Sequence, residues 1–212
     1  MDKYTETLET WNKIANLYQE KFMNLALYNH TYDVICDAIV VRNAKLLEIG
    51  CGPGNISKYL LTKRPDFEIM GIDSAPQMIE LAKSNNPSAS FLVMDARKID
   101  ELRVKFDGII CGFVIPYLSI EESKRLIRHS HKLLNANGLL YLSFVEGDPA
   151  DSEFKVGNNG NRVFFNYHKA AKLVDDLRSC EFENINILRV PYSMGKEPYE
   201  FHTVITATKP LA

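Results

Sequence analysis

Short apolar runs alternate along this chain with stretches in which apolar residues recur every three or four positions. The apolar runs have the length of buried strands and lie at residues 46–49, 67–72, 90–94, 106–113 and 139–145. Between them, residues 55–61 and the segment that starts at Ser119 have the spacing of amphipathic helices. Ser119 and Glu122 form a capping-box pattern, and Gly138 is the expected end of that helix. This alternation predicts an α/β fold with a doubly wound sheet.

The remaining segments extend this core at both ends. They are expected to form helices at 7–22, 28–41 and 169–179, a long loop at 146–162, an extended aromatic segment at 163–168, and two closing antiparallel strands at 184–190 and 201–208 joined by 191–200. The loop prediction depends on composition, because residues 146–162 are rich in Gly, Asn, Asp and Pro.

Composition narrows the range of partners. With 212 residues, the chain is long enough for one domain with a sizeable core. Its net charge of −2 gives no electrostatic reason to expect a nucleic acid or an anionic membrane as partner. No apolar run approaches the roughly 20 residues of a membrane helix, and the polar start of the chain is unlike a secretory signal. The four cysteines form no C-x-x-C pair. We therefore expect a cytoplasmic protein with neither a metal site nor a disulfide framework.

Three glycines at alternate positions form the strongest motif in the chain. Gly50, Gly52 and Gly54 follow the first predicted strand and precede a predicted helix. Glycine has no Cβ, so such a turn lets a ligand approach the bare backbone. The nicotinamide fingerprint G-x-G-x-x-G would require a glycine in place of Asn55. The Lys-Ser or Lys-Thr pair of a phosphate-binding ATPase loop is also missing. A turn that holds no ligand is the alternative.

Acidic residues stand where three predicted strands end. Glu48 comes two residues before the first glycine, Asp73 ends the second strand, and Asp95 ends the third. Asp73 lies about 20 residues past the glycines, where nucleotide-binding folds place the carboxylate that accepts hydrogen bonds from ribose hydroxyls. A carboxylate suits a diol because both of its oxygens accept. Ser74 is expected to cap the next helix, with Pro76 in its first turn.

In this order, Glu48, the glycines, Asp73 and Asp95 resemble the motifs of the class I S-adenosylmethionine-dependent methyltransferases. The resemblance runs from about the first helix to the last strand and concerns the cofactor more than the substrate. It implies a Rossmann-like, doubly wound, seven-stranded, mostly parallel sheet with an antiparallel last strand and an N-terminal helical lid. It also implies one methyltransferase domain over residues 1–212, with the lid in 1–42, the cofactor-binding core in 43–145 and the substrate side in 146–212.

The resemblance also implies a cofactor, S-adenosyl-L-methionine, with S-adenosyl-L-homocysteine as the product. In the adenosine half of the site, Asp73 would hold the ribose. Asp95 would read the adenine amino group together with the Ala96 backbone. Ser74 and Met78 would line the adenosine pocket.

In the methionine half, the resemblance places Glu48 near the cofactor and Tyr18 at its methionine end, unless Tyr18 is an ordinary core or surface tyrosine. Cys51 and Cys111 fall in the expected pocket, where small side chains that fill tight space are favoured over nucleophiles. The full expected cofactor-binding set is Tyr18, Glu48, Gly50, Cys51, Gly52, Gly54, Asp73, Ser74, Met78, Asp95, Ala96 and Cys111.

The sequence motifs that concern the methyl acceptor are less specific than those for the cofactor. Residues 111–117 read Cys-Gly-Phe-Val-Ile-Pro-Tyr, where base-amine methyltransferases have an Asn- or Asp-Pro-Pro-aromatic segment, which argues against methylation of a nucleobase amine. His168 ends the aromatic segment and is the predicted catalytic base, with His202 as the second choice. Aromatic residues that would either wall a substrate pocket or belong to the core are Phe164, Phe165, Tyr167, Tyr192 and Tyr199.

We therefore expect an enzyme that transfers a methyl group by in-line displacement to a small-molecule acceptor, whose reacting atom stays open. Neither a nucleic acid nor a membrane is expected as a partner, and a homodimer is a further hypothesis. A methyltransferase that acts on protein or RNA and a non-catalytic S-adenosylmethionine-binding module are the alternatives. A nicotinamide oxidoreductase is disfavoured by Asn55 and by the additional Asp95.

Overall fold

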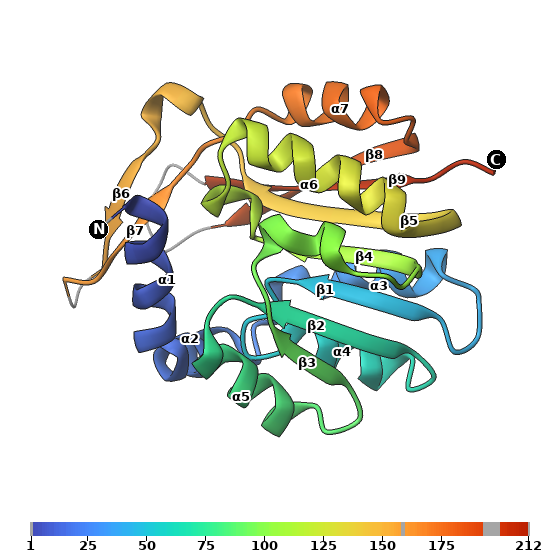
Figure 1. Cartoon of the computed structure of the whole chain (residues 1–212), viewed down its shortest axis with the longest axis horizontal. Helices are drawn as coiled ribbons and strands as arrows, with labels where there is room; N and C mark the ends of the chain where they lie inside the picture. The colour runs from blue at the N-terminus through green and yellow to red at the C-terminus, as the bar shows by residue number, and fades with distance from the viewer. Residues whose placement is uncertain (1, 158–159, 193–199, 212) are drawn as a thin grey trace.

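The computed structural model in Figure 1 describes residues 2–157, 160–192 and 200–211. Its centre is a seven-stranded sheet in the order β3-β2-β1-β4-β5-β9-β8. The strands are β1 (Lys45–Ile49), β2 (Glu68–Asp73), β3 (Ser90–Val93), β4 (Phe106–Gly112), β5 (Leu134–Val145), β8 (Glu183–Tyr192) and β9 (Glu200–Thr208). β1 pairs in parallel with β2 and β4, whereas β9 runs antiparallel to β5 and β8. The predicted mostly parallel sheet with an antiparallel last strand is confirmed.

Helices cover both faces of the sheet. They are α3 (Asn29–Ala38), α4 (Asn55–Lys63), α5 (Pro76–Asn85), α6 (Ile120–Leu133) and α7 (Ala170–Ser179). In β1, Leu46 shares a buried cluster with residues of α3 and α4, and its neighbour Leu47 shares one with residues of α6 and α7. Successive strand residues point to opposite faces, so β1 is buried almost throughout, as in parallel sheets covered on both sides. In the described part of the chain, every helix is too short or too polar to cross a membrane.

The N-terminal region contains two helices where the sequence predicted one over residues 7–22. α1 (Lys3–Lys13) and α2 (Ala15–Phe22) meet at Ile14, whose φ of −100° and ψ of 15° leave the helical region. The prediction of one helix was wrong because the apolar spacing continues across the break. The short η1 (Ala26–Tyr28) then leads into α3.

Two strand boundaries also differ from the prediction. Gly138 does not end α6, because β5 follows that helix directly and contains Gly138. The carbonyl of Gly138 accepts a hydrogen bond from the backbone N–H of Lys209, at the end of β9. β3 ends at Val93, two residues before Asp95, which instead begins the 3₁₀ helix η2 (Ala96–Glu101).

The helix caps were predicted correctly at one helix and wrongly at another. Ser119 and Glu122 form the expected capping box at the start of α6. Ser74 does not cap α5: the N-cap is Ala75, and the Asp73 side chain accepts a hydrogen bond from the Ala75 N–H. No side chain makes a cap hydrogen bond at the start of α5, so the predicted Ser74 cap was wrong.

The predicted loop at 146–162 contains ordered elements. These are η4 (Pro149–Asp151) and β6 (Glu153–Val156), which pairs antiparallel with β7 (Arg162–Phe165) in a separate two-stranded sheet. Phe154 and Phe164 meet across this pair with ring centroids 5.2 Å apart. β6 was missed because it is four residues long and lies among turn-forming residues.

α1 lies against this hairpin, so segments far apart in the sequence meet beside the sheet (Figure 1). The Thr7 hydroxyl accepts a hydrogen bond from the Phe164 N–H at 2.9 Å, and the Thr10 hydroxyl donates to the Arg162 carbonyl at 2.8 Å. Glu6 and Arg162 form an ion pair at the same contact. These interactions fix α1 over the carboxyl ends of the central strands.

Replacement of Thr7 by valine is expected to loosen α1. Valine cannot accept a hydrogen bond, so the Phe164 N–H would lose its partner at a cost of about 1–3 kcal/mol. We expect faster amide hydrogen exchange in α1, with the exchange of the central strands unchanged. Thr62→Val is the matched control, because Thr62 is exposed on α4 and bonds only within its own helix. Equal exchange in α1 of both variants would contradict the anchoring role.

Candidate active site

The turn after β1 places glycines where other residues would be strained or would clash. Gly50, Gly52 and Gly54 have φ angles of 65°, 52° and 80°. A Cβ on Gly50 would lie 2.1 Å from a methyl carbon of Val114, and one on Gly54 would lie 2.4 Å from the Asn86 side-chain nitrogen. Gly54 is also the N-cap of α4. The alternate glycines are therefore required by backbone conformation and by close packing.

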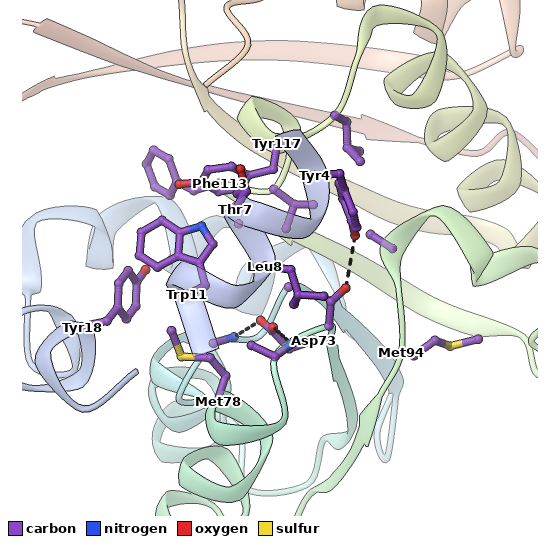
Figure 2. Close-up of a pocket in the computed structure, with 18 residues that line it drawn as sticks. Tyr4, Thr7, Leu8, Trp11, Tyr18, Asp73, Met78, Met94, Phe113 and Tyr117 are labelled. Carbon is purple, nitrogen blue, oxygen red and sulfur yellow. Dashed lines mark hydrogen bonds between the residues drawn. The ribbon is translucent and has the colours of Figure 1, made fainter. Parts of the chain in front are cut away.

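Two adjoining cavities open at this turn. The first cavity, shown in Figure 2, lies between α1 and the ends of β1 and β2. The second cavity lies on the side of η1 and β9. Residues that line both cavities are Trp11, Tyr18, Gly50, Gly52, Gly112, Phe113 and Tyr117. These shared residues mark the place where the two cavities meet.

Asp73 lines the first cavity and ties the glycine turn to β2. Its Oδ2 accepts a hydrogen bond from the Gly52 N–H at 2.9 Å, and its Oδ1 accepts one from the Ala75 N–H at 2.9 Å. Burial raises the pKa of Asp73, although these backbone donors oppose the shift. Each carboxylate oxygen keeps a free lone pair for a further donor.

Glu48 lies beneath the glycine turn and lines the second cavity. Its side chain is 1% exposed, and its Oε2 accepts hydrogen bonds from the N–H and the hydroxyl of Ser57. Burial raises the pKa of Glu48 to about 8, and the two hydrogen bonds from Ser57 only partly offset that effect. Much of the Glu48 population is therefore protonated at neutral pH.

Trp11 stands between the two cavities. Its ring centroid is 5.5 Å from that of Tyr18 and 5.6 Å from that of Tyr117 (Figure 2). Its indole N–H is buried and has no hydrogen-bond partner among the described residues. An unpaired buried donor is costly, so this N–H is suited to an acceptor atom on a ligand.

The expected cofactor residues fall into three groups. Those that line the first cavity are Tyr18, Gly50, Gly52, Asp73, Ser74, Met78 and Ala96. Glu48 and Cys51 line the second cavity. Gly54, Asp95 and Cys111 line neither. Burial raises the pKa of both the Cys51 and the Cys111 thiols, as expected for small side chains that fill tight space.

Asp95 is bound by Arg97, which sequence reasoning missed. Nη2 of Arg97 lies 2.6 Å from Oδ2 of Asp95, and Nε of Arg97 lies 3.0 Å from the same oxygen. Burial would raise the pKa of Asp95, but the hydrogen bonds from Arg97 outweigh it and lower that pKa. The Arg97 guanidinium also lies 3.5 Å from the Tyr4 ring centroid, so it connects the strand end to the start of α1.

The structure does not bring His168 to either cavity. The ring is 4% exposed, and its Nε2 is 3.0 Å from the Leu118 carbonyl oxygen. Burial lowers the pKa of His168. This placement favours a buried structural histidine over a base that meets an acceptor.

His202, the second choice from the sequence, does line the second cavity. Its Nδ1 is 2.6 Å from the Tyr28 hydroxyl, and its ring stacks on that of Tyr192 at 4.5 Å. Of the predicted aromatic wall, Phe165 and Tyr192 line this cavity, and Phe164 and Tyr167 do not. Tyr199 lies outside the described residues.

Comparisons with known proteins agree with this geometry. A family model described as a methyltransferase domain matches residues 46–138, which include the glycine turn, Asp73 and Asp95. An uncharacterized methyltransferase of Alkaliphilus oremlandii is 28% identical over 98% of this chain and 95% of its own length. These matches support a class I S-adenosylmethionine-dependent methyltransferase. The predicted family and cofactor are confirmed.

Two further relatives of this methyltransferase differ in how much they share. A putative methyltransferase of Invertebrate iridescent virus 6 is 25% identical over 64% of this chain. The match covers about half (49%) of the viral protein. The crystal structure of magnesium protoporphyrin IX methyltransferase from Synechocystis PCC 6803, with bound S-adenosylmethionine, has a TM-score of 0.71. It is 18% identical and covers 99% of this chain and 98% of its own, a likeness that concerns the fold.

The residues present in this methyltransferase fit the cofactor. The glycine turn leaves space that a Cβ would close, Asp73 offers two acceptor oxygens, and the Trp11 N–H offers an unpaired donor. In the described ranges, no cluster of three or more His, Cys, Asp or Glu residues could hold a metal ion.

Replacement of Glu48 by glutamine is expected to change how stability depends on pH. The folded protein holds the Glu48 proton up to a pKa of about 8, whereas an unfolded glutamate loses it near 4.3. The folded state therefore binds more protons between these values, and this contribution to stability falls as pH rises. The fall is on the order of 4 kcal/mol at most. Glutamine does not titrate, and its carbonyl still accepts from Ser57.

Urea unfolding at pH 5 and at pH 8 measures this effect. We expect the wild-type protein to lose stability between the two pH values, and Glu48→Gln to lose less. Glu101→Gln, at an exposed position on η2, should behave as the wild type. Equal pH dependence in wild type and Glu48→Gln would contradict a protonated Glu48.

Proposed function

We propose that this methyltransferase transfers the methyl group to a small-molecule acceptor held in the second cavity, with the cofactor in the first. The observation that carries the proposal is the shared wall between two cavities beneath the α1 lid. A methyl group presented at Gly50, Gly52 and Tyr18 would be within reach of an acceptor enclosed by aromatic side chains. This arrangement suits a compact acceptor better than a folded protein or an RNA helix.

In the first cavity, we assign Asp73 to the ribose hydroxyls. Both of its oxygens are already oriented by backbone donors, so they are fixed in place for the diol. Ser74, Met78 and Ala96 would wall the adenosine half. We assign adenine recognition to Ala96 more than to the Asp95 carboxylate, because Arg97 already engages both oxygens of that carboxylate.

When bound, S-adenosylmethionine supplies an electrophilic methyl group on a positively charged sulfur. The chain's own residues position the acceptor and exclude water. Trp11 and Tyr18 close the site from the lid side, while Gly112, Phe113 and Tyr117 form the wall opposite. Positioning of two reactants in line accounts for much of the barrier reduction in such reactions, by roughly 7–11 kcal/mol at best. A cytoplasmic location and a homodimer remain predictions from the sequence.

Asp73→Asn is expected to weaken binding of S-adenosylmethionine and S-adenosylhomocysteine roughly tenfold to hundredfold, or about 1–3 kcal/mol. The amide keeps one oxygen acceptor but replaces the other with a donor, which opposes the Gly52 N–H or a ribose hydroxyl. Calorimetric titration measures the affinity, and the fluorescence of Trp11, the single tryptophan, gives a second signal.

The control variant is Asp107→Asn. Asp107 also accepts a backbone hydrogen bond, from Lys45 at the start of β1, but it lies at the opposite edge of the sheet. It should bind both ligands as the wild type does, and NAD should bind none of the proteins. Unchanged affinity in Asp73→Asn would refute the ribose assignment. Absence of binding in the wild type would refute the proposed function itself.

A further inference from the structure

The second cavity is walled by aromatic rings from several parts of the chain. Tyr28 of η1 lies 5.2 Å from Phe113, which follows β4, and Phe113 lies 5.1 Å from His202 of β9. Tyr192 of β8 stacks on His202, with ring centroids 4.5 Å apart. Aromatic rings favour other rings in stacked or edge-to-face contact, so these walls suit an acceptor that is itself aromatic.

A polar path leads from this cavity toward the surface. The Tyr28 hydroxyl is 2.6 Å from Nδ1 of His202, and Nε2 of His202 is 3.9 Å from a carboxylate oxygen of Glu200. Tyr28 and His202 are buried, at 8% and 7% exposure, whereas the Glu200 side chain is 49% exposed. The three groups therefore run from the cavity wall to solvent.

The protonation states fix the direction of the first hydrogen bond. Burial raises the pKa of Tyr28, so its hydroxyl keeps its proton. Burial lowers the pKa of His202 to about 4, so its ring is neutral at pH 7. The titratable side chains that face His202 are Tyr28, Tyr192 and Glu200. The Tyr28 hydroxyl therefore donates to Nδ1, and its oxygen remains able to accept a hydrogen bond from a ligand hydroxyl.

Charge favours a neutral acceptor. A protonated amine would place a second positive charge beside the cofactor's sulfonium in a buried site. Glu48, the buried acid that lines the second cavity, has a pKa of about 8 and is a weak counter-charge at neutral pH. A neutral hydroxyl avoids this cost and still needs a group to take its proton. The Tyr28–His202 pair is placed to do so.

We propose that the second cavity binds a neutral aromatic compound with a ring hydroxyl, and that Tyr28 and His202 remove the hydroxyl proton during methyl transfer. The proposal rests on the proposed function, a small-molecule acceptor in this cavity. The acceptor oxygen bonds to the methyl carbon as the carbon–sulfur bond breaks, and the bonding electron pair stays on sulfur. The hydroxyl proton passes to the Tyr28 oxygen while the Tyr28 proton passes to Nδ1 of His202, and Nε2 then releases a proton toward Glu200.

A weak base suffices for this step. The acceptor oxygen gains positive charge as it bonds to the methyl carbon, so its proton becomes far more acidic in the transition state than in the free compound. A histidine with a pKa near 4 stays ready to accept at neutral pH, because it is not already protonated. A ring hydroxyl, which resembles tyrosine with an ordinary pKa near 10, suits such a base better than an aliphatic alcohol.

The test uses four compounds that differ only in the reacting group: 2-naphthol, 2-naphthylamine, 2-naphthoic acid and naphthalene-2-thiol. Calorimetry measures their binding to the complex of the whole protein with S-adenosylhomocysteine. Mass spectrometry measures the methylated product with S-adenosylmethionine. We expect 2-naphthol to bind and to be methylated, at least about tenfold faster than the other three.

Two variants test the proton path. Tyr28→Phe and His202→Gln should lower kcat for 2-naphthol roughly hundredfold, with the affinity for S-adenosylhomocysteine unchanged. Tyr59→Phe is the control, because it removes a tyrosine hydroxyl bonded to Asp33 outside both cavities, and it should retain full activity. Wild-type kcat should be flat from about pH 6 to 8, whereas that of His202→Gln should rise with pH as the naphthol ionises. A more acidic nitro-substituted naphthol should restore activity to His202→Gln.

Three outcomes would overturn the proposal. Methylation of the amine, acid or thiol in place of the naphthol would reject the substrate class while leaving methyl transfer to a small molecule intact. Cofactor binding without binding of any of the four compounds would reject this cavity as an aromatic acceptor site. A normal kcat and an unchanged pH profile in both Tyr28→Phe and His202→Gln would reject the proton path. Failure of the wild type to bind S-adenosylmethionine would instead reject the underlying function.

Discussion

The left-handed backbone of the glycine turn is the constraint on which both cavities depend. Gly50 and Gly52 line each cavity, and the space above them exists because neither has a Cβ. The turn also joins three parts of the sheet edge: the Gly52 N–H bonds to Asp73 at the end of β2, and Gly50 packs on Val114 after β4. A side chain at Gly50 would clash with Val114, and one at Gly52 would project toward Tyr18, so either change would alter a wall that both cavities share.

Burial determines the protonation of the two acids next to the glycine turn, Glu48 and Asp73. Glu48 and Asp73 both have raised pKa values, and their hydrogen-bond donors are neutral groups of Ser57, Gly52 and Ala75. Two buried acids with neutral partners favour a ligand that carries positive charge, since a nearby cation stabilises their ionised forms. The cofactor carries such a charge, so its binding and the ionisation of these acids are thermodynamically linked.

The sequence allowed local motifs to be identified, but it did not reveal contacts between segments that lie far apart in the chain. The glycines, Glu48 and Asp73 could be placed because each lies at or just after the carboxyl end of a strand, and parallel strands bring these ends to one edge. The sequence ranked His168 above His202, but it could not show that His202 lines a cavity, because that depends on how β9 packs against η1, about 170 residues away in sequence. The sequence placed Asp95 near the site. Its hydrogen bond with Arg97 could not be predicted, because it depends on side-chain orientation.

The lid helix α1 must open for product release, and the contacts that hold it in place determine how readily it can do so. α1 covers the first cavity. It is held to β7 by a hydrogen bond from the Phe164 N–H to Thr7, by one from Thr10 to the Arg162 carbonyl, and by the ion pair of Glu6 with Arg162. Single hydrogen bonds each contribute about 1 kcal/mol, and an exposed ion pair adds little to them. Leu8 and Trp11 also pack against Ala75 and Met78, so release of α1 must break this apolar contact as well, in a local opening that leaves the central sheet folded. Such a lid can enclose Trp11 and the reacting groups during transfer and still open for product release in each cycle.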